Sequence, residues 1–129
     1  MRAIDTNVLV RLLARDDPAQ TRAAEKFIAS GAWVSHLVLA ETCWVLESVY
    51  QVKTAGLLHA LDMLQTHESL VLQDVETVRR ATDRLRAKPS LGFSDCLVLE
   101  IALAFGHKPL GTFDRALATS GGTGANRII

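Results

Sequence analysis

Short runs of apolar residues recur along the chain, separated by longer segments in which apolar residues follow a helical period. Such runs, only a few residues long, predict short buried strands. We expect strands over Arg2–Ile4, Ala32–Ser35, Leu70–Leu72 and Lys108–Gly111, with a last edge strand over Arg127–Ile129. The strands are therefore spread over the whole chain, with room for helices between them.

The segments between the strands carry apolar residues three or four positions apart, which predicts helices that pack by one face. Short polar side chains mark several starts, because they bind the free N–H groups of a first helical turn. We expect helices from Asp5 or Thr6, from Pro18 to about Ala29, from His36 to about Tyr50, from Thr54 to about Thr66, from Asp74 to about Ala87 and from Ser94 through Phe105. A short helical turn is expected from Asp114, followed by a loop over residues 120–124.

Strands that alternate with helices are typical of a parallel sheet covered by helices on both faces. The pattern predicts an α/β fold, a three-layer α/β/α arrangement around a central, mainly parallel sheet. No linker, repeat or low-complexity segment interrupts it, so we expect a single domain over residues 1–129. In such sheets, ligands bind beyond the carboxyl ends of the strands.

Composition narrows the class of protein. The chain is 49% hydrophobic, and its 14 acidic and 14 basic residues give a net charge of zero. Any binding of nucleic acid must therefore depend on local charge, because bulk charge is absent. The N-terminus does not resemble a signal peptide, and no apolar stretch reaches membrane-spanning length. Cys43 and Cys96 have no metal-binding or redox spacing, so we expect both to pack in the core of a soluble, cytoplasmic protein.

Four acidic residues follow strands or begin helices at the predicted functional edge. They are Asp5 after the first strand, Glu41 in the helix after the second, Asp95 at the start of an apolar helix and Asp114 after the fourth strand. Asp5 alone would be explained by a place at a rim, by a helix cap or by a counter-charge. Carboxylates that converge in one cleft repel each other, and the usual remedy is a hard divalent cation such as Mg²⁺ or Mn²⁺.

The same residues resemble the PIN domain family. The motif "IDTN" at residues 4–7, Glu41, Asp95 and the motif "TFD" at residues 112–114 occur in the family's order, and the resemblance covers the whole chain. It is closest to the VapC-type toxins of toxin–antitoxin pairs. The resemblance implies a ribonuclease that needs Mg²⁺ or Mn²⁺, with Asp5, Glu41, Asp95 and Asp114 as catalytic and metal-binding residues.

The resemblance also implies supporting residues and partners. Thr6, Asn7 and Thr112 match polar companions that orient carboxylates and water. The implied reaction is in-line attack on the phosphorus of RNA by a metal-activated water, with Glu41 either binding a second ion or holding that water. Implied partners are the RNA substrate, a second copy of the chain in a homodimer, and an antitoxin protein that blocks the cleft.

Other functions fit parts of the pattern. A phosphorelay receiver needs an acidic pair after the first strand, where Thr6 and Asn7 follow Asp5, and an aspartate directly after a central strand, where Gln73 stands. A haloacid-dehalogenase-like phosphatase needs a second aspartate at position 7, which is Asn7. A non-catalytic PIN-like binding module is the alternative that keeps the same fold.

The remaining charged residues have simpler interpretations. Arg11 and Arg15 lie close after Asp5 and are candidate RNA contacts. One predicted helix carries several basic residues, for which we favour a solvated face over a track for RNA phosphates. They are Arg79, Arg80, Arg84, Arg86 and Lys88. Glu100 is the only charge in the middle of an apolar helix, and we expect it on an exposed or partner-facing stripe, with a core ion pair as the rarer alternative.

Overall fold

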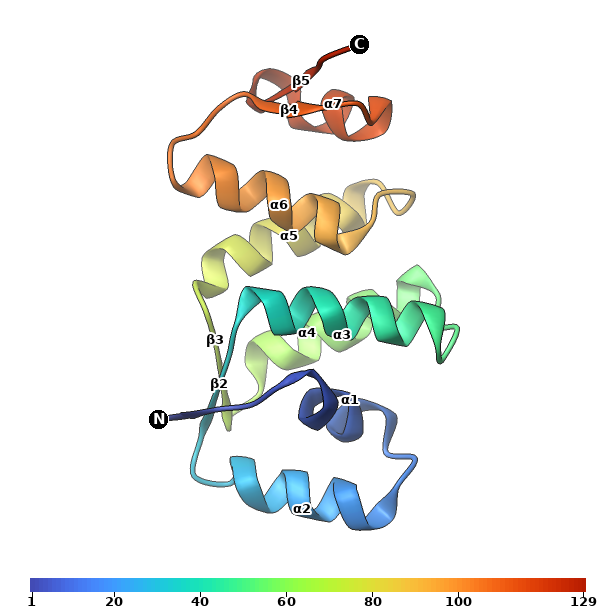
Figure 1. Cartoon of the computed structure of the whole chain (residues 1–129), viewed down its shortest axis with the longest axis vertical. Helices are drawn as coiled ribbons and strands as arrows, with labels where there is room; N and C mark the ends of the chain where they lie inside the picture. The colour runs from blue at the N-terminus through green and yellow to red at the C-terminus, as the bar shows by residue number, and fades with distance from the viewer. The chain divides into compact units, whose positions relative to one another are not determined.

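The computed structural model describes residues 1–129, which divide into two compact units, Met1–Val75 and Glu76–Ile129 (Figure 1). Each unit combines helices with short parallel strands. The predicted α/β class with parallel strands is therefore confirmed. The strands form two hydrogen-bonded sheets, a three-stranded sheet in the first unit and a two-stranded sheet in the second.

The first unit begins with a strand and returns to its sheet twice. Its elements are β1 (Arg2–Ala3), α1 (Thr6–Ala14), α2 (Pro18–Ile28), β2 (Ala32–Val34), α3 (His36–Ser48), α4 (Thr54–Thr66) and β3 (Leu70–Leu72). The sheet has the order β1-β2-β3 and is parallel throughout, with Ala3 paired to Trp33 and Val34 paired to Leu72. Helices α1 and α3 follow β1 and β2 directly, so both begin at the carboxyl edge of the sheet (Figure 1).

Side-chain caps fix the starts of three helices in the first unit. Asp5 accepts a hydrogen bond from the N–H of Val8, Asp17 from that of Gln20, and Ser35 from that of Val38, each at 3.1 Å. These bonds satisfy N–H groups that have no partner within the first turn. The predicted starts of α1, α2 and α3 are therefore confirmed.

The core of the first unit is almost entirely aliphatic. Its buried side chains include Ile4, Leu9, Val34, Leu39, Leu57, Leu61, Leu64 and Leu72. Helix α1 packs against α2 and α3, and α4 packs against β3. This packing holds the N-terminal end of α1 beside α3, so residues at the start of α1 can contact side chains of α3.

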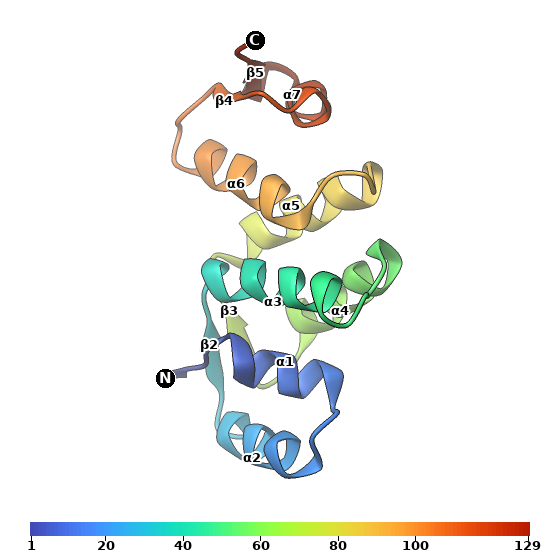
Figure 2. The same ribbon diagram turned by 45° about the vertical axis from the view of Figure 1, so that its right-hand side comes forward.

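The second unit is built from two long helices and a small α/β motif. Its elements are α5 (Val75–Ala87, whose first residue closes the first unit), α6 (Phe93–Ala104), β4 (Leu110–Thr112), α7 (Arg115–Gly121), η1 (Gly122–Gly124) and β5 (Ala125–Arg127). Strands β4 and β5 are parallel and lie beside α7 (Figure 2). The most apolar helix, α6, has 12 residues. No helix of the chain combines the length and apolar character needed to cross a bilayer.

One prediction for a helix start in this unit needs correction. Ser94 does not cap α6, because the helix already begins at Phe93 and Gly92 is its N-cap residue. Phe93 is only 1% exposed, and its burial brings the first turn forward. Helix α5 begins at Val75, directly after Asp74, which has a left-handed φ of 38°.

The expected loop over residues 120–124 is also wrong, because α7 continues to Gly121 and a 3₁₀ turn follows. A β-carbon at Gly121 would lie 2.5 Å from that of Ala125, so glycine permits the close approach of β5. Gly122 ends the helix with a positive φ of 58°. The last strand consequently comes earlier than expected, over Ala125–Arg127.

Candidate active site

Asp5 lies at the N-terminus of α1, directly after the first strand of the sheet. Its neighbour Ile4 is buried and donates a backbone hydrogen bond to Trp33, which extends the pairing of β1 and β2. Asp5 itself is exposed, and only its Oδ1 atom is used by the cap to Val8. The cap and a binding role are therefore compatible, because Oδ2 makes no hydrogen bond or ion pair within the protein.

Glu41 lies close to the same end of α1. The hydroxyl of Thr6, the first residue of α1, donates a hydrogen bond of 3.3 Å to Oε1 of Glu41 on α3. The two residues are 35 positions apart in the sequence. Glu41 is exposed, and its Oε2 atom has no partner. The structure thus brings two of the four predicted acids, Asp5 and Glu41, to one place, with Thr6 bonded to one and adjacent to the other.

Asp95 lies in the first turn of α6, in the second unit. It is the third residue of the helix, two positions later than Phe93. Its side chain is exposed and makes no hydrogen bond or ion pair. The N-terminal end of a helix carries partial positive charge, so the carboxylate of Asp95 is favoured there without a basic partner.

Asp114 is fixed by the turn between β4 and α7. Its Oδ1 atom accepts a hydrogen bond of 2.8 Å from the N–H of Leu117 and caps α7. The hydroxyl of Thr112, the last residue of β4, accepts the N–H of Asp114 at 3.0 Å. Two consecutive side-chain bonds therefore determine the orientation of Asp114, and the predicted companion Thr112 makes one of them.

The four predicted acids share one property. None of Asp5, Glu41, Asp95 and Asp114 forms an ion pair with arginine or lysine, whereas five other acids of the chain do. Each of the four also keeps at least one carboxylate oxygen without a partner. Exposed oxygen donors with free lone pairs are the ligands that Mg²⁺ and Mn²⁺ prefer. Within each unit, no three metal-ligating side chains form one group; in the first unit, the Thr6–Glu41 bond places Glu41 beside the residue that follows Asp5.

Comparison of the sequence with known protein families identifies the family of this chain. The PIN domain family matches residues 3–121, which includes all four acids and runs through both units. The chain belongs to the PIN domain family. No curated protein and no solved structure matches it. PIN domains are nuclease-type domains that act on nucleic acids, typically with divalent metals, and they are often found in toxin–antitoxin systems.

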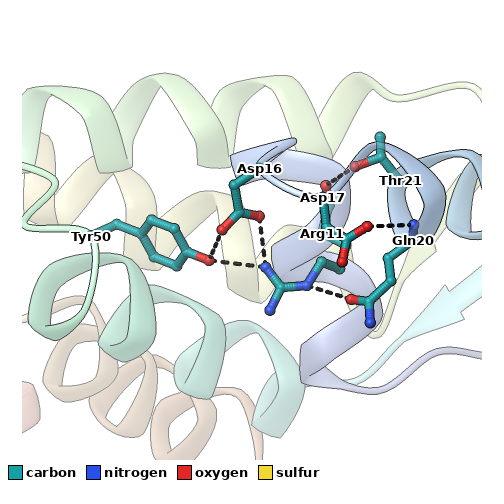
Figure 3. A network of polar contacts seen from close by, with 6 residues as sticks. All are labelled: Arg11, Asp16, Asp17, Gln20, Thr21 and Tyr50. Carbon is teal, nitrogen blue, oxygen red and sulfur yellow. Dashed lines mark hydrogen bonds and ion pairs between the residues drawn. The ribbon is translucent and has the colours of Figure 1, made fainter.

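In this PIN domain, Arg11 and Arg15, the predicted RNA contacts, are engaged with side chains of the protein. Arg11 donates from Nε to Gln20 at 2.8 Å and from Nη1 to Asp16 at 2.7 Å and to the hydroxyl of Tyr50 at 2.9 Å (Figure 3). Tyr50 also donates to Asp16 at 2.7 Å. Arg15 forms an exposed ion pair of 2.6 Å with Glu25.

These contacts have electrostatic consequences. The hydrogen bond from Tyr50, together with the ion pair to Arg11, lowers the pKa of the Asp16 carboxyl below its usual value. The contacts with Tyr50 and Asp16 raise the pKa of the Arg11 guanidinium. Both groups therefore stay charged across the physiological range, and Asp16 balances the charge of Arg11. The N-cap residue of α2 is its neighbour Asp17.

Both cysteines of the PIN domain are buried, as predicted. Burial raises the pKa of the Cys43 thiol to about 12, with a contribution from the charge of Glu47. Burial likewise raises the pKa of Cys96 to about 11.

We expect neither thiol to react with a disulfide reagent in the folded protein at about pH 8, where a free cysteine reacts readily. Both should react when the protein is unfolded in urea. The check is a spectrophotometric thiol titration with and without urea. Rapid reaction of either thiol in the folded protein would show that its helix opens, contrary to the packing described here.

A buried ion pair, the less favoured of the two expectations for Glu100, lies in the second unit. Glu100, expected on an exposed stripe, is 6% exposed and accepts hydrogen bonds from Nε and Nη2 of Arg84 at 3.0 and 2.7 Å. Nη1 of Arg84 donates to the backbone oxygen and hydroxyl of Ser120, at 2.6 and 3.0 Å. The expectation of an exposed stripe was therefore wrong and the rarer alternative, a core ion pair, is confirmed, because Arg84 on α5 supplies the counter-charge. Arg84, the basic residue expected on a solvated face, ties α5 to α6 and α7.

Proposed function

We propose that this PIN domain is a metal-dependent endoribonuclease, the VapC-type toxin of a toxin–antitoxin pair. Its catalytic and metal-binding residues are Asp5, Glu41, Asp95 and Asp114, and its cofactor is Mg²⁺ or Mn²⁺. The observation that carries the proposal is the contact between the "IDTN" motif and Glu41 in a member of a nuclease family. We further propose that residues 1–129 act as one domain, which is supported by a family match that runs through both units.

The donor set supports a divalent cation. Mg²⁺ retains several waters and is commonly held by only one or two carboxylates from the protein. Asp5 and Glu41 meet that requirement, because each has an exposed oxygen without a partner. Thr6, which follows Asp5 in the sequence, donates a hydrogen bond to Glu41. A cation bound there would lower the pKa of a water and neutralise charge on a phosphate.

The protein's own residues have separate tasks in this proposal. The cap to Val8 fixes the orientation of the Asp5 carboxylate and leaves its second oxygen for the ligand. Thr6 restricts the rotation of Glu41, as supporting residues of metal sites do. Thr112 holds the backbone of Asp114 in the same way. Asn7, which makes no side-chain hydrogen bond within the protein, is free to bind water or substrate.

We propose RNA as the substrate, a homodimer as the assembly, and a cognate antitoxin as a second protein partner in the cytoplasm. Exposed apolar side chains support a protein partner at the active face. Leu37 and Trp44 on α3 are 69% and 66% exposed, and both lie close in sequence to Glu41. A partner that covered them would also hinder access to Glu41. Arg11 and Arg15 remain our candidates for RNA contacts.

The function is tested by incubating the purified chain with total RNA and either Mg²⁺ or Mn²⁺. We expect discrete RNA fragments on a denaturing gel, loss of cleavage in EDTA, and recovery when the metal is restored. Mapping the new ends would then identify the target as transfer, ribosomal or messenger RNA.

A folded, metal-loaded protein that binds RNA but leaves all three classes intact would instead favour the non-catalytic binding module. Cleavage that persists in EDTA would contradict the metal-dependent mechanism. Membership of the PIN family argues against the phosphorelay receiver, and incubation with acetyl phosphate should leave the protein without an aspartyl phosphate.

A further inference from the structure

A hollow of about 390 Å³ lies beside Asp5 in the first unit. Asp5 and residues along the facing sides of α1 and α2 line it. Its volume falls in the range of about 300–1,000 Å³ that is typical of pockets for small organic groups. It adjoins the proposed catalytic carboxylate, so whatever occupies it lies next to the reacting part of the substrate.

Arg11 lines this hollow and keeps one guanidinium nitrogen without a partner in the protein. Two of its three guanidinium nitrogens are fixed by Gln20, Asp16 and Tyr50, and Figure 3 draws the third, Nη2, without any bond. Because Asp16 neutralises the charge, Nη2 acts as a directed hydrogen-bond donor more than as a free cation. Such a group is better suited to the edge of a base than to the charge of a phosphate.

The rest of the lining agrees with that chemistry. The amide nitrogen of Gln20 and the whole amide of Asn7 have no hydrogen-bond partner within the protein. The wall from α2 is apolar, with Ala23 and Phe27 among its residues. Arg2 supports that wall, since its guanidinium stacks over the Phe27 ring at 3.7 Å. A flat heterocycle with a polar edge matches an apolar wall next to amide and guanidinium groups.

We infer that this hollow binds one unstacked nucleobase of single-stranded RNA, next to the bond that is cleaved. The inference rests on the proposed function and deepens it by naming the element that reads sequence. Recognition of RNA commonly depends on unstacked bases with hydrogen bonds to their edges. The two free groups on Arg11 and Gln20 are donors, which favours a base edge with adjacent acceptors. Guanine, with O6 and N7, is the base of that kind that arginine reads most often.

The test compares the protein with Ala23→Leu, which fills the hollow without removing any polar group. Ala23 is exposed on α2, and leucine is a good helix former, so the fold should be kept. Ala19→Leu is the matched control, because Ala19 is exposed on the same helix and does not line the hollow. Arg11→Lys keeps the charge and removes the Nη2 donor.

The probes are short oligouridylates that carry a single guanine, adenine or cytosine, with binding measured by fluorescence anisotropy in EDTA so that none is cleaved. We expect the guanine probe to bind the natural protein and Ala19→Leu most tightly. Ala23→Leu should bind it about tenfold more weakly and lose the preference for guanine. Arg11→Lys should lose the preference too.

A guanine preference that survives in Ala23→Leu would overturn the inference, and so would equal binding of all three probes by the natural protein. Cleavage assays with Mg²⁺ keep this result separate from the proposed function. Metal-dependent cleavage by Ala23→Leu at the same cut sites as the natural protein would contradict the base pocket and support the proposed nuclease activity. A guanine preference that needs Ala23, in a protein without cleavage, would support the pocket and contradict the nuclease.

Discussion

Asp5→Asn should reduce metal-dependent RNA cleavage at least about a hundredfold, since loss of a mere supporting group at a metal site already costs about 10- to 100-fold. The substitution removes the negative charge and keeps the shape of the side chain. Asparagine caps helices as well as aspartate does, so the bond to Val8 should survive and the free energy of unfolding should change by less than about 0.5 kcal/mol. Initial rates of cleavage and urea unfolding curves measure the two effects separately.

Asp17→Asn is the matched control for this experiment. Asp17 caps α2 through its Oδ1 with the same 3.1 Å hydrogen bond that Asp5 makes on α1, and it lies outside the proposed site. We expect its cleavage rate to equal that of the natural protein. Asp5→Ala should lose both activity and about 1 kcal/mol of stability, because the cap is removed as well. Full cleavage by folded Asp5→Asn would exclude Asp5 as a metal ligand.

Local signals in the sequence predicted much of the fold. Asp5, Asp17, Ser35 and Asp114 each cap the helix that follows them, because a cap bond reaches only three residues along the chain. The short apolar runs predicted the parallel strands because this signal is local too: the apolar side chains that a strand buries are its own. Where a start was wrong, as at Ser94, a distant packing requirement, the burial of Phe93, outweighed the local cap signal.

Contacts between distant residues could not be predicted in this way. The bond from Thr6 to Glu41 depends on how α1 packs against α3, and Arg84 reaches Glu100 and Ser120 only through the packing of three helices. The sequence does indicate the oxygen donors of the candidate site, because three of them are aspartates at or near helix starts and the fourth, Glu41, lies in the second turn of α3. It does not supply the hollow beside Asp5, which exists only because α2 folds back along α1.

Glu100→Ala should be among the most destabilising single substitutions in the second unit. It leaves the Arg84 guanidinium, whose side chain is only 19% exposed, without the carboxylate that accepts two of its hydrogen bonds. Removing one partner of a buried ion pair typically costs about 3–5 kcal/mol, because the remaining charge stays out of water without compensation. A domain of this size is stable by only about 5–15 kcal/mol in total. Urea unfolding followed by circular dichroism measures the loss.

Glu25→Ala tests whether the loss of stability in Glu100→Ala is caused by the burial of the ion pair and not by the loss of the contact alone. The Arg15–Glu25 ion pair is as short as the Arg84–Glu100 pair, 2.6 Å against 2.7 Å, but its side chains are 58% and 46% exposed. We expect Glu25→Ala to cost less than about 1 kcal/mol, because water already solvates both charges. The double variant Arg84→Met/Glu100→Leu should recover most of the stability lost in Glu100→Ala, since it removes the stranded charge and fills the space with apolar atoms. Equal losses for Glu25→Ala and Glu100→Ala would mean that Glu100 is reached by solvent, and the buried link from α5 to α6 would then be wrong.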